Sequence, residues 1–280
     1  MKEKPDRAER RRRFREQVRE NPRLAAVYFI LRLLVILMLV AQAFNHNFEN
    51  VFLCVLTLFL FTLPSFLERK IRIDIPNTLE IIILLFIFAA EILGEIRAYY
   101  VTFPYWDTML HTLWGFLAAG IGFALADILN RSQASRLQLT PIYMAITAFC
   151  FSMTIGALWE LFEYTMDTFV GFDMQKDTIV AAFSSVTLDP TNSNVAIHVG
   201  DIVSTTITTA SGETVVIPNG YLDIGIHDSM ADIFVNMCGA IVFSIIGFAY
   251  VKNRNNGSKK NFAANFIPRL REIYQETRHS

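Results

Sequence analysis

The chain has 280 residues, of which 53% are apolar, and 24 of them are phenylalanine. This composition excludes an ordinary water-soluble fold. The formal net charge of −1 at pH 7 says little by itself, whereas the distribution of the charges along the chain is informative.

The apolar residues fall into blocks of roughly 20, which is the length that crosses a ~30 Å hydrocarbon layer as an α-helix. In chain order we expect spanning helices at about 24–44, 50–67, 78–97, 107–129, 141–166 and 228–251. A helix satisfies its own backbone hydrogen bonds in lipid, and no alternating strand series suggests a barrel. The sequence therefore predicts an all-α membrane protein, with a six-helix transmembrane bundle over 24–251.

Lys and Arg are concentrated on one side of these blocks. Ten lie in 1–23, three in 68–77, two in 130–140 and seven after Val251, which makes 22 of the 25. The loops on the opposite side contain only Arg97 and Lys176. By the positive-inside rule, the basic segment 1–23 and the basic tail 252–280 are both expected in the cytoplasm, under a bacterial cell membrane.

The first block allows two interpretations. Ala41-Gln42-Ala43 follows an apolar run, as a cleaved signal peptide requires, but a basic region that reaches Arg32 favours a span. Arg32 itself is expected to extend its guanidinium to the headgroups, and a buried pair with Glu80 is the alternative.

The two ends of the chain are expected to lie against the inner surface. The run Arg10-Arg11-Arg12-Arg13 favours anionic lipid, at roughly 1 kcal/mol per charge, over nucleic acid, because the membrane is the nearer anion. The segment 262–277 places Phe266, Leu270 and Ile273 on one helix face, so it is expected to lie on the membrane surface or to pack on the bundle.

The segment 167–227 is too long to be a simple connector. Val195 to Ile217 is rich in Val, Ile and Thr around a turn at Ser211-Gly212-Glu213, which predicts a small β-hairpin. The sequence therefore predicts a β-containing extracytoplasmic insert over 167–227.

Ionisable residues gather at the outer ends of the predicted spans, where each needs an explanation. They are Glu91 and Glu95, Asp107 and His111, Glu160, Glu163 and Asp167, and Asp228 and Asp232. The spacings i,i+4 and i,i+3,i+7 place each of the last three sets on one helix face. Small or polar residues continue these faces inward: Gly115, Ala118 and Gly122; Gly156 and Ser152; Asn236, Gly239 and Ala240. Since membrane helices approach closely at small residues, we expect the three acidic faces to converge on an outward-facing pocket.

So many carboxylates in one pocket require a counter-cation or shared protons. Oxygen-rich sets suit Mg²⁺, Mn²⁺ or Ca²⁺, whereas zinc usually takes more His or Cys. The candidate metal ligands are Asp107, His111, Glu160, Glu163, Asp228 and Asp232, and the first four are also the candidate catalytic residues. The alternative is structural: Asp107 and Asp228 as first-turn or N-cap acids, and Glu163 and Asp167 as solvated side chains.

These motifs also resemble a known family. Tyr105-Trp106-Asp107 with His111 and Gly115, Trp159-Glu160 with Glu163, Asp173-Met174-Gln175 and His227-Asp228 with Asp232 are similar to motifs of the YjdF-like bacterial inner-membrane proteins, over roughly 90–245. A more distant likeness is to VanZ-like proteins. The resemblance implies that the six candidates occupy motif positions, but the YjdF-like family has no assigned activity, and the insert at about 178–222 departs from its pattern.

Three functions remain open at this point. The acidic pocket could bind or process an envelope lipid or a lipid-linked phosphate with a divalent cation. The same carboxylates could couple transport to protons or cations, or they could be structural in an accessory scaffold. A homo-oligomer or an envelope partner is compatible with each of the three.

Overall fold

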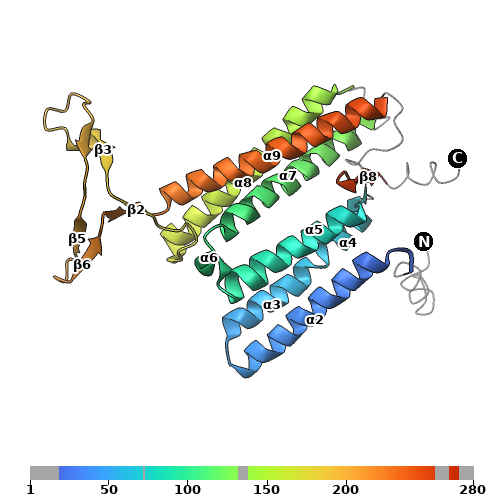
Figure 1. Cartoon of the computed structure of the whole chain (residues 1–280), viewed down its shortest axis with the longest axis horizontal. Helices are drawn as coiled ribbons and strands as arrows, with labels where there is room; N and C mark the ends of the chain where they lie inside the picture. The colour runs from blue at the N-terminus through green and yellow to red at the C-terminus, as the bar shows by residue number, and fades with distance from the viewer. Residues whose placement is uncertain (1–18, 72, 132–137, 256–264, 271–280) are drawn as a thin grey trace. The chain divides into compact units, whose positions relative to one another are not determined.

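The computed structural model describes residues 19–71, 73–131, 138–255 and 265–270 (Figure 1). Most of the predicted segment 1–23 lies outside these residues. The chain forms two compact units, which we name unit 1 (Met1–Ile155 with Val235–Ser280) and unit 2 (Gly156–Phe234). Helices α8 and α9 each begin in one unit and end in the other.

Helices dominate the described part of the chain. They are α2 (Pro22–Phe44), α3 (Phe48–Leu60), α4 (Leu63–Ile71), α5 (Asn77–Phe88), η1 (Ala89–Ile96), α6 (Tyr99–Thr102), α7 (Trp106–Arg131), α8 (Pro141–Thr165), η2 (Met166–Val170) and α9 (Ile226–Asn255). Residues at their N-termini explain where several of these helices begin. Pro occupies the beginning of α2 and of α8, where its missing N–H costs nothing, and the Asn47 side chain accepts the Asn50 N–H ahead of α3.

Five helices in the described residues are long and apolar enough to cross a membrane: Pro22–Phe44, Phe48–Glu68, Trp106–Asn130, Pro141–Val170 and Ile226–Lys252. A helical membrane protein with several spans is therefore confirmed. The third predicted span, 78–97, is not among the five; the structure forms it as α5 followed by the π-helical η1. The six-span count stays a prediction.

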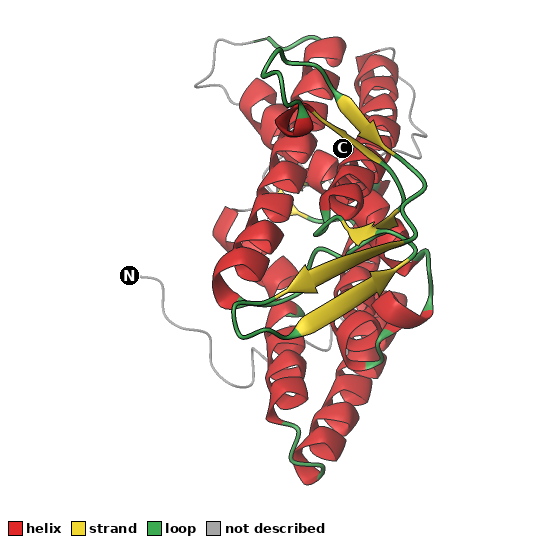
Figure 2. Cartoon of the chain, turned by 90° about the vertical axis from the view of Figure 1, so that its left-hand side faces the viewer, coloured by secondary structure: helices red, strands yellow, loops and turns green. Residues whose placement is uncertain are grey.

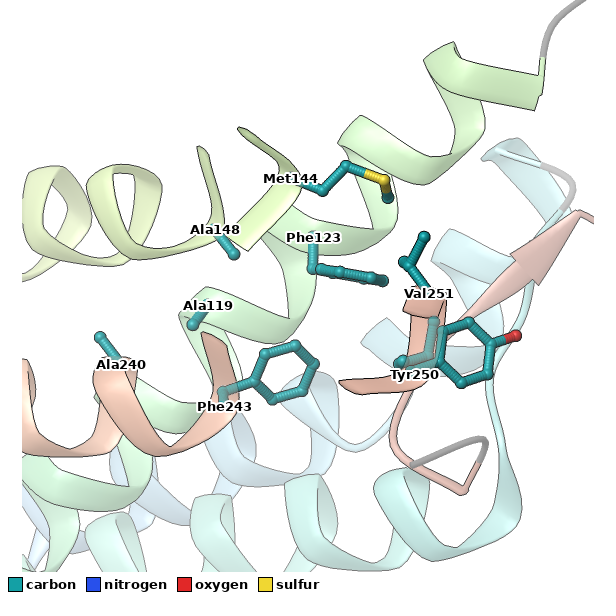
Figure 3. Close-up of a cluster of buried hydrophobic side chains, with 9 residues drawn as sticks. Ala119, Phe123, Met144, Ala148, Ala240, Phe243, Tyr250 and Val251 are labelled. Carbon is teal, nitrogen blue, oxygen red and sulfur yellow. The ribbon is translucent and has the colours of Figure 1, made fainter. Parts of the chain in front are cut away.

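The core of unit 1 is apolar on both sides of α5. Leu31, Val35, Cys54, Phe61 and Leu84 are buried among α2, α3 and α5. On the other side, Phe123, Phe243 and Tyr250 form a chain of edge-to-face aromatic contacts with centroids 6.0 and 6.4 Å apart. Figure 3 shows these rings between α7 and α9, with Ala119 and Ala240 nearby, where the helices have no large side chains to hold them apart.

Glycine sets the distance between α7 and α9 in unit 1. A Cβ on Gly115 would lie 2.1 Å from the Asn236 carbonyl oxygen, and one on Gly239 would lie 2.0 Å from that of Thr112. The two backbones are therefore in direct contact. The prediction that small residues mark a close helix approach is confirmed at these positions.

The directions of the three helices follow from their contacts in unit 1. Gly115 meets Asn236, Gly120 meets Phe243 and Gly247 meets Phe123. The contacts advance together, so α7 and α9 run in the same direction. Helix α8 runs the opposite way, because Asn130 bonds the Met144 sulfur while the Ser152 hydroxyl bonds the Gly115 carbonyl.

The expected helix over 262–277 is wrong where the structure describes the segment. Arg269–Leu270 forms the short strand β8, which pairs antiparallel with β1 (Ile73–Asp74). Pro268 explains the difference, because it disfavours helical geometry at the preceding residue and has no N–H to donate. The expected packing on the bundle is confirmed: Ile267 is buried and the Phe266 ring meets Phe116 at 5.8 Å.

Unit 2 contains the strands of the insert. They are β2 (Ile179–Val180), β3 (Phe183–Ser185), β4 (Ile197–Val199), β5 (Ser204–Thr208), β6 (Thr214–Pro218) and β7 (Tyr221–Leu222), with the 3₁₀ turn η3 (Val186–Leu188). They pair antiparallel as β2 with β7, β3 with β4 and β5 with β6. Figure 2 shows β5 and β6 side by side as the largest pair. The predicted hairpin around Ser211-Gly212-Glu213 is confirmed, with Ile207 opposite Val215.

Arg32 is exposed and its guanidinium lies over the Tyr28 ring, 5.0 Å from the centroid. The buried Glu80 carboxylate instead accepts the Tyr28 hydroxyl at 2.8 Å. This arrangement favours the interpretation in which the Arg32 guanidinium is exposed over the one in which it pairs with Glu80, because Tyr28 lies between the two charged groups.

Candidate functional site

Asp107 and His111 are brought together by the first turns of α7. Asp107 Oδ1 lies 3.5 Å from His111 Nε2, and both side chains are largely covered. Two ligands of one cation at bond lengths of about 2.2 Å are separated by about 3.1–3.6 Å. The pair can therefore share a metal ion, or the carboxylate can orient the imidazole.

One turn further along α7, the contact with α9 contains polar groups. Asn236 lies against Gly115 and is only 2% exposed. The Asn236 amide nitrogen lies 3.7 Å from the Met153 sulfur, and the buried Ser152 hydroxyl donates to the Gly115 carbonyl at 2.8 Å. All four residues belong to unit 1.

Several buried polar atoms of unit 1 have no hydrogen-bond partner among the described residues. They are Trp106 Nε1, Trp114 Nε1, Asn236 Oδ1 and Ser244 Oγ. Such groups are uncommon in folded proteins because each loses its hydration without compensation. Trp106, Trp114 and Asn236 lie within two turns of His111 or against its helix, whereas Ser244 is two turns further along α9.

An aromatic cavity of about 280 Å³ opens at the start of α7. It is lined by Tyr99, Phe103, Pro104, Tyr105 and Trp106. The Tyr99 ring packs edge-to-face on both Phe103 and Trp106, with centroids 4.6 and 4.9 Å apart. An apolar wall directly before the polar Asp107 suits an amphipathic ligand.

In unit 2, the end of α8 buries two carboxylates on one face. Glu160 is 6% exposed, and the buried Glu163 accepts the Trp159 indole N–H at 3.0 Å. On the first turns of α9, Asp232 is 4% exposed. The burial of Glu163, which is 8% exposed, contradicts the alternative in which this residue is a solvated side chain.

Two other predicted acids hold the chain in place. Both oxygens of Asp167 accept backbone N–H groups, from Met174 at 2.6 Å and from Gln175 at 2.8 Å. Asp228 accepts the Lys176 N–H at 2.8 Å. These bonds fix the segment 171–176 against the start of α9, which is a structural role for Asp167 and for one Asp228 oxygen.

Asp223 was not predicted from the sequence, although it is the residue that caps α9. Its carboxylate accepts the N–H groups of Gly225 at 3.2 Å, His227 at 2.8 Å and Thr178 at 2.7 Å. Burial opposes the charge, but these three donors hold the pKa of Asp223 below its usual range. An Asp just ahead of a helix is the signal that could have identified it.

Asp189 has a similar role in the insert. It accepts the Thr191 hydroxyl at 2.6 Å and the N–H groups of Thr191, Ser193 and Val195. The Thr191 hydroxyl, followed by these amides, lowers the pKa of Asp189 to about 2. The pKa of Asp177 shifts in the opposite direction. Burial raises it first, and the neighbouring carboxylates Asp173, Asp223 and Asp167 raise it further.

Other ionisable residues near the predicted outer ends of the spans differ in exposure. Glu91 is half-buried and Glu95 is exposed, both in η1. His227 is exposed beside Asp228, and His198 pairs with the Ser184 hydroxyl at 3.1 Å in the insert.

A family model described as "Predicted membrane protein (DUF2238)" matches residues 27–253. This match covers most of the chain and is consistent with the resemblance to YjdF-like proteins. No curated protein and no solved structure matched the chain.

Proposed function

The chain belongs to the DUF2238 family of predicted membrane proteins, and we propose that it binds a divalent cation at the outer face of a bacterial cell membrane. There the cation holds the phosphate of an envelope lipid or of a lipid-linked precursor. From the sequence pattern, Asp107, His111 and Asp232 are the proposed ligands, with Glu160 as the candidate acid or base.

The register of α7 against α9 in unit 1 is the observation that carries this proposal. Gly115 contacts Asn236, and the two helices run in the same direction. One turn toward the start of each helix from these residues come His111 and Asp232. His111 shares a face of α7 with Gly115, and Asp232 shares a face of α9 with Asn236, while Asp107 lies beside His111.

The position of Glu160 on α8 supports its role. Glu160 shares a helix face with Ser152, whose hydroxyl bonds the Gly115 carbonyl in unit 1. A buried carboxylate two turns beyond Ser152 can act as a base for water, or complete the ligand set. Glu163 is the weaker candidate, since it accepts the Trp159 N–H.

Oxygen ligands with one imidazole fit Mn²⁺ and Mg²⁺ better than Zn²⁺. A bound cation polarises a phosphoryl oxygen and lowers the pKa of bound water. The aromatic cavity beside Asp107 offers the apolar surface that a lipid requires next to its headgroup.

The proposed topology has six spans, with α5 and η1 together forming the third, and both termini in the cytoplasm. The positive-inside count supports it. In this arrangement the Arg10–Arg13 run binds anionic lipid at the inner surface.

The test is a cation titration of the purified full chain. Mn²⁺, Mg²⁺ and Ca²⁺ are added separately while the melting temperature is recorded, followed by assay of phosphate release from a lipid-linked diphosphate. At 100 times its Kd a cation adds about 2.7 kcal/mol of stability, which Asp232→Asn and His111→Ala should abolish. Glu49→Gln, an exposed acid at the start of α3, is the matched control. A melting temperature that none of the three cations changes would refute the proposal.

A scaffold is the second candidate, favoured by the structural roles of Asp167, Asp223 and one Asp228 oxygen. It predicts that Asp232→Asn restores a deletion phenotype fully, whereas removal of 178–222 does not.

A further inference from the structure

Asn236 is one of the buried polar groups of unit 1 that the proposed ligand set does not use. It lies on α9 where α7 is in backbone contact, and its amide oxygen has no hydrogen-bond partner among the described residues. The cost of burying such an oxygen requires an explanation.

A role in holding the helices together does not explain Asn236. Asparagine in membrane helices usually bonds a group on a neighbouring helix. Here its nitrogen meets only a thioether sulfur at 3.7 Å, a weak acceptor, and its oxygen meets no described group. Turning the amide over would place the oxygen against that sulfur and leave the NH₂ group without an acceptor.

The position of Asn236 on α9 supports a role as a cation ligand. Side chains on a helix lean toward its N-terminus, so the Asn236 amide covers the turn of α9 that precedes it. Its neighbour across the contact is Gly115, one turn from His111 on α7. An amide oxygen is also a ligand that hard cations such as Ca²⁺, Mg²⁺ and Mn²⁺ accept.

We infer that Asn236 supplies a neutral oxygen ligand to the divalent cation proposed at Asp107 and His111. This inference rests on the proposed function and adds to it a selectivity: a site with an amide oxygen favours a hard cation over zinc. It also explains why an amide, rather than an apolar side chain, is buried at one of the two backbone contacts between α7 and α9.

Mn²⁺ binding to the full chain in detergent tests the inference, with free Mn²⁺ measured by electron paramagnetic resonance. Asn236→Leu is expected to weaken Mn²⁺ binding at least tenfold, yet to leave the cation-free melting temperature equal or higher, because it removes a buried group without a partner. Asn236→Asp keeps the oxygen and adds charge, so it should bind Mn²⁺ at least as tightly as the wild type. Ser244→Ala, a second buried polar group without a partner on α9, is the matched control and should change nothing.

The outcomes separate this inference from the proposed function. If the wild type binds Mn²⁺ and Asn236→Leu binds it equally well, Asn236 is not a ligand while the proposed function stands. If the wild type binds none of the three cations, both are refuted. Should Asn236→Leu fail to fold, a loss of Mn²⁺ binding in a folded Asn236→Asp would overturn the inference by itself.

Discussion

In unit 1, two helices touch backbone to backbone at Gly115 and Gly239, whereas in unit 2 the chain between α8 and α9 is fixed by carboxylates that accept backbone N–H groups. The first arrangement depends on the absence of side chains and the second on ionised ones. The difference shows that the two units are stabilised by different kinds of contact. Substitutions can therefore be chosen that disrupt the glycine contact without changing the carboxylate–amide bonds, or the reverse.

The largest expected effect is on the glycine contact. Gly115→Ala places a methyl group 2.1 Å from the Asn236 carbonyl oxygen, and since backbone cannot move aside cheaply, we expect a loss of about 3 kcal/mol. Thermal unfolding in detergent measures it. Gly120→Ala is the matched control, because its methyl group would lie 3.1 Å from the movable Phe243 ring, and its loss should be under half as large. Equal losses would contradict the backbone contact.

A smaller effect is expected where carboxylates hold the chain. Asp223→Ala leaves the N–H groups of Thr178, Gly225 and His227 without their acceptor, at a cost of about 2 kcal/mol. Hydrogen exchange should accelerate at these three amides. Asp201→Asn, an exposed acid of the same insert, should leave the exchange unchanged. Unaltered protection in Asp223→Ala would show that the cap is not what orders this segment.

Acid pH should weaken the carboxylate–amide bonds of unit 2. Asp189 and Asp223 have folded-state pKa values below their usual range, about 2 for Asp189. Their stabilisation is therefore complete above an unfolded pKa of about 3.9 and is lost as the pH falls through the folded value. Hydrogen exchange over 186–196 and 221–228, corrected for intrinsic rates, should show declining protection between about pH 4 and pH 2. The raised pKa of Asp177 acts with the opposite sign, at higher pH, so it does not mask this decline. Constant protection would contradict the role of these carboxylates.

The smallest effect is expected on the outer surface of α2. Only 11% of its apolar window is buried in the protein, against 56% for α7. Leu37 is exposed there, so Leu37→Ala should change stability in detergent by less than about 0.5 kcal/mol. A loss of several times that size would show that this face of α2 packs against protein, such as a second copy of the chain.

Much of the fold could be predicted because hydrocarbon thickness and helix geometry leave few alternatives. The apolar blocks at 24–44, 107–129 and 141–166 correspond to α2, α7 and α8 within two residues. The hairpin could also be predicted, from a Gly turn between β-branched runs. For the third block, 78–97, the change from α-helix to π-helix at Ala89 could not be predicted, because apolar composition does not distinguish the two types of helix.

In the C-terminal tail, by contrast, the prediction from the sequence was wrong. The spacing of Phe266, Leu270 and Ile273 favours a helix, but the pairing of Arg269 with Asp74 comes from a segment almost 200 residues away. No local pattern contains that information, although Pro268 gives a warning. The candidate site divides similarly: the spacing of Asp107 and His111 predicts their pairing, whereas the role of Asp167 depends on where the chain at Met174 returns.

The sequence alone determined that this is a helical membrane protein with a β-containing insert, because apolar length, charge asymmetry and turn residues act locally. Only the tertiary structure decided how the polar residues are used. In the structure, Asp167 and Asp223 accept hydrogen bonds from backbone amides, and Glu160 and Asp232 are buried. The Asn236 oxygen is buried without a described hydrogen-bond partner, where Gly115 contacts the backbone of Asn236. The physical reason is that burial depends on neighbours distant along the chain, as does the bond from the Thr178 N–H to Asp223, and that the path of the loops decides which nearby amides a carboxylate meets.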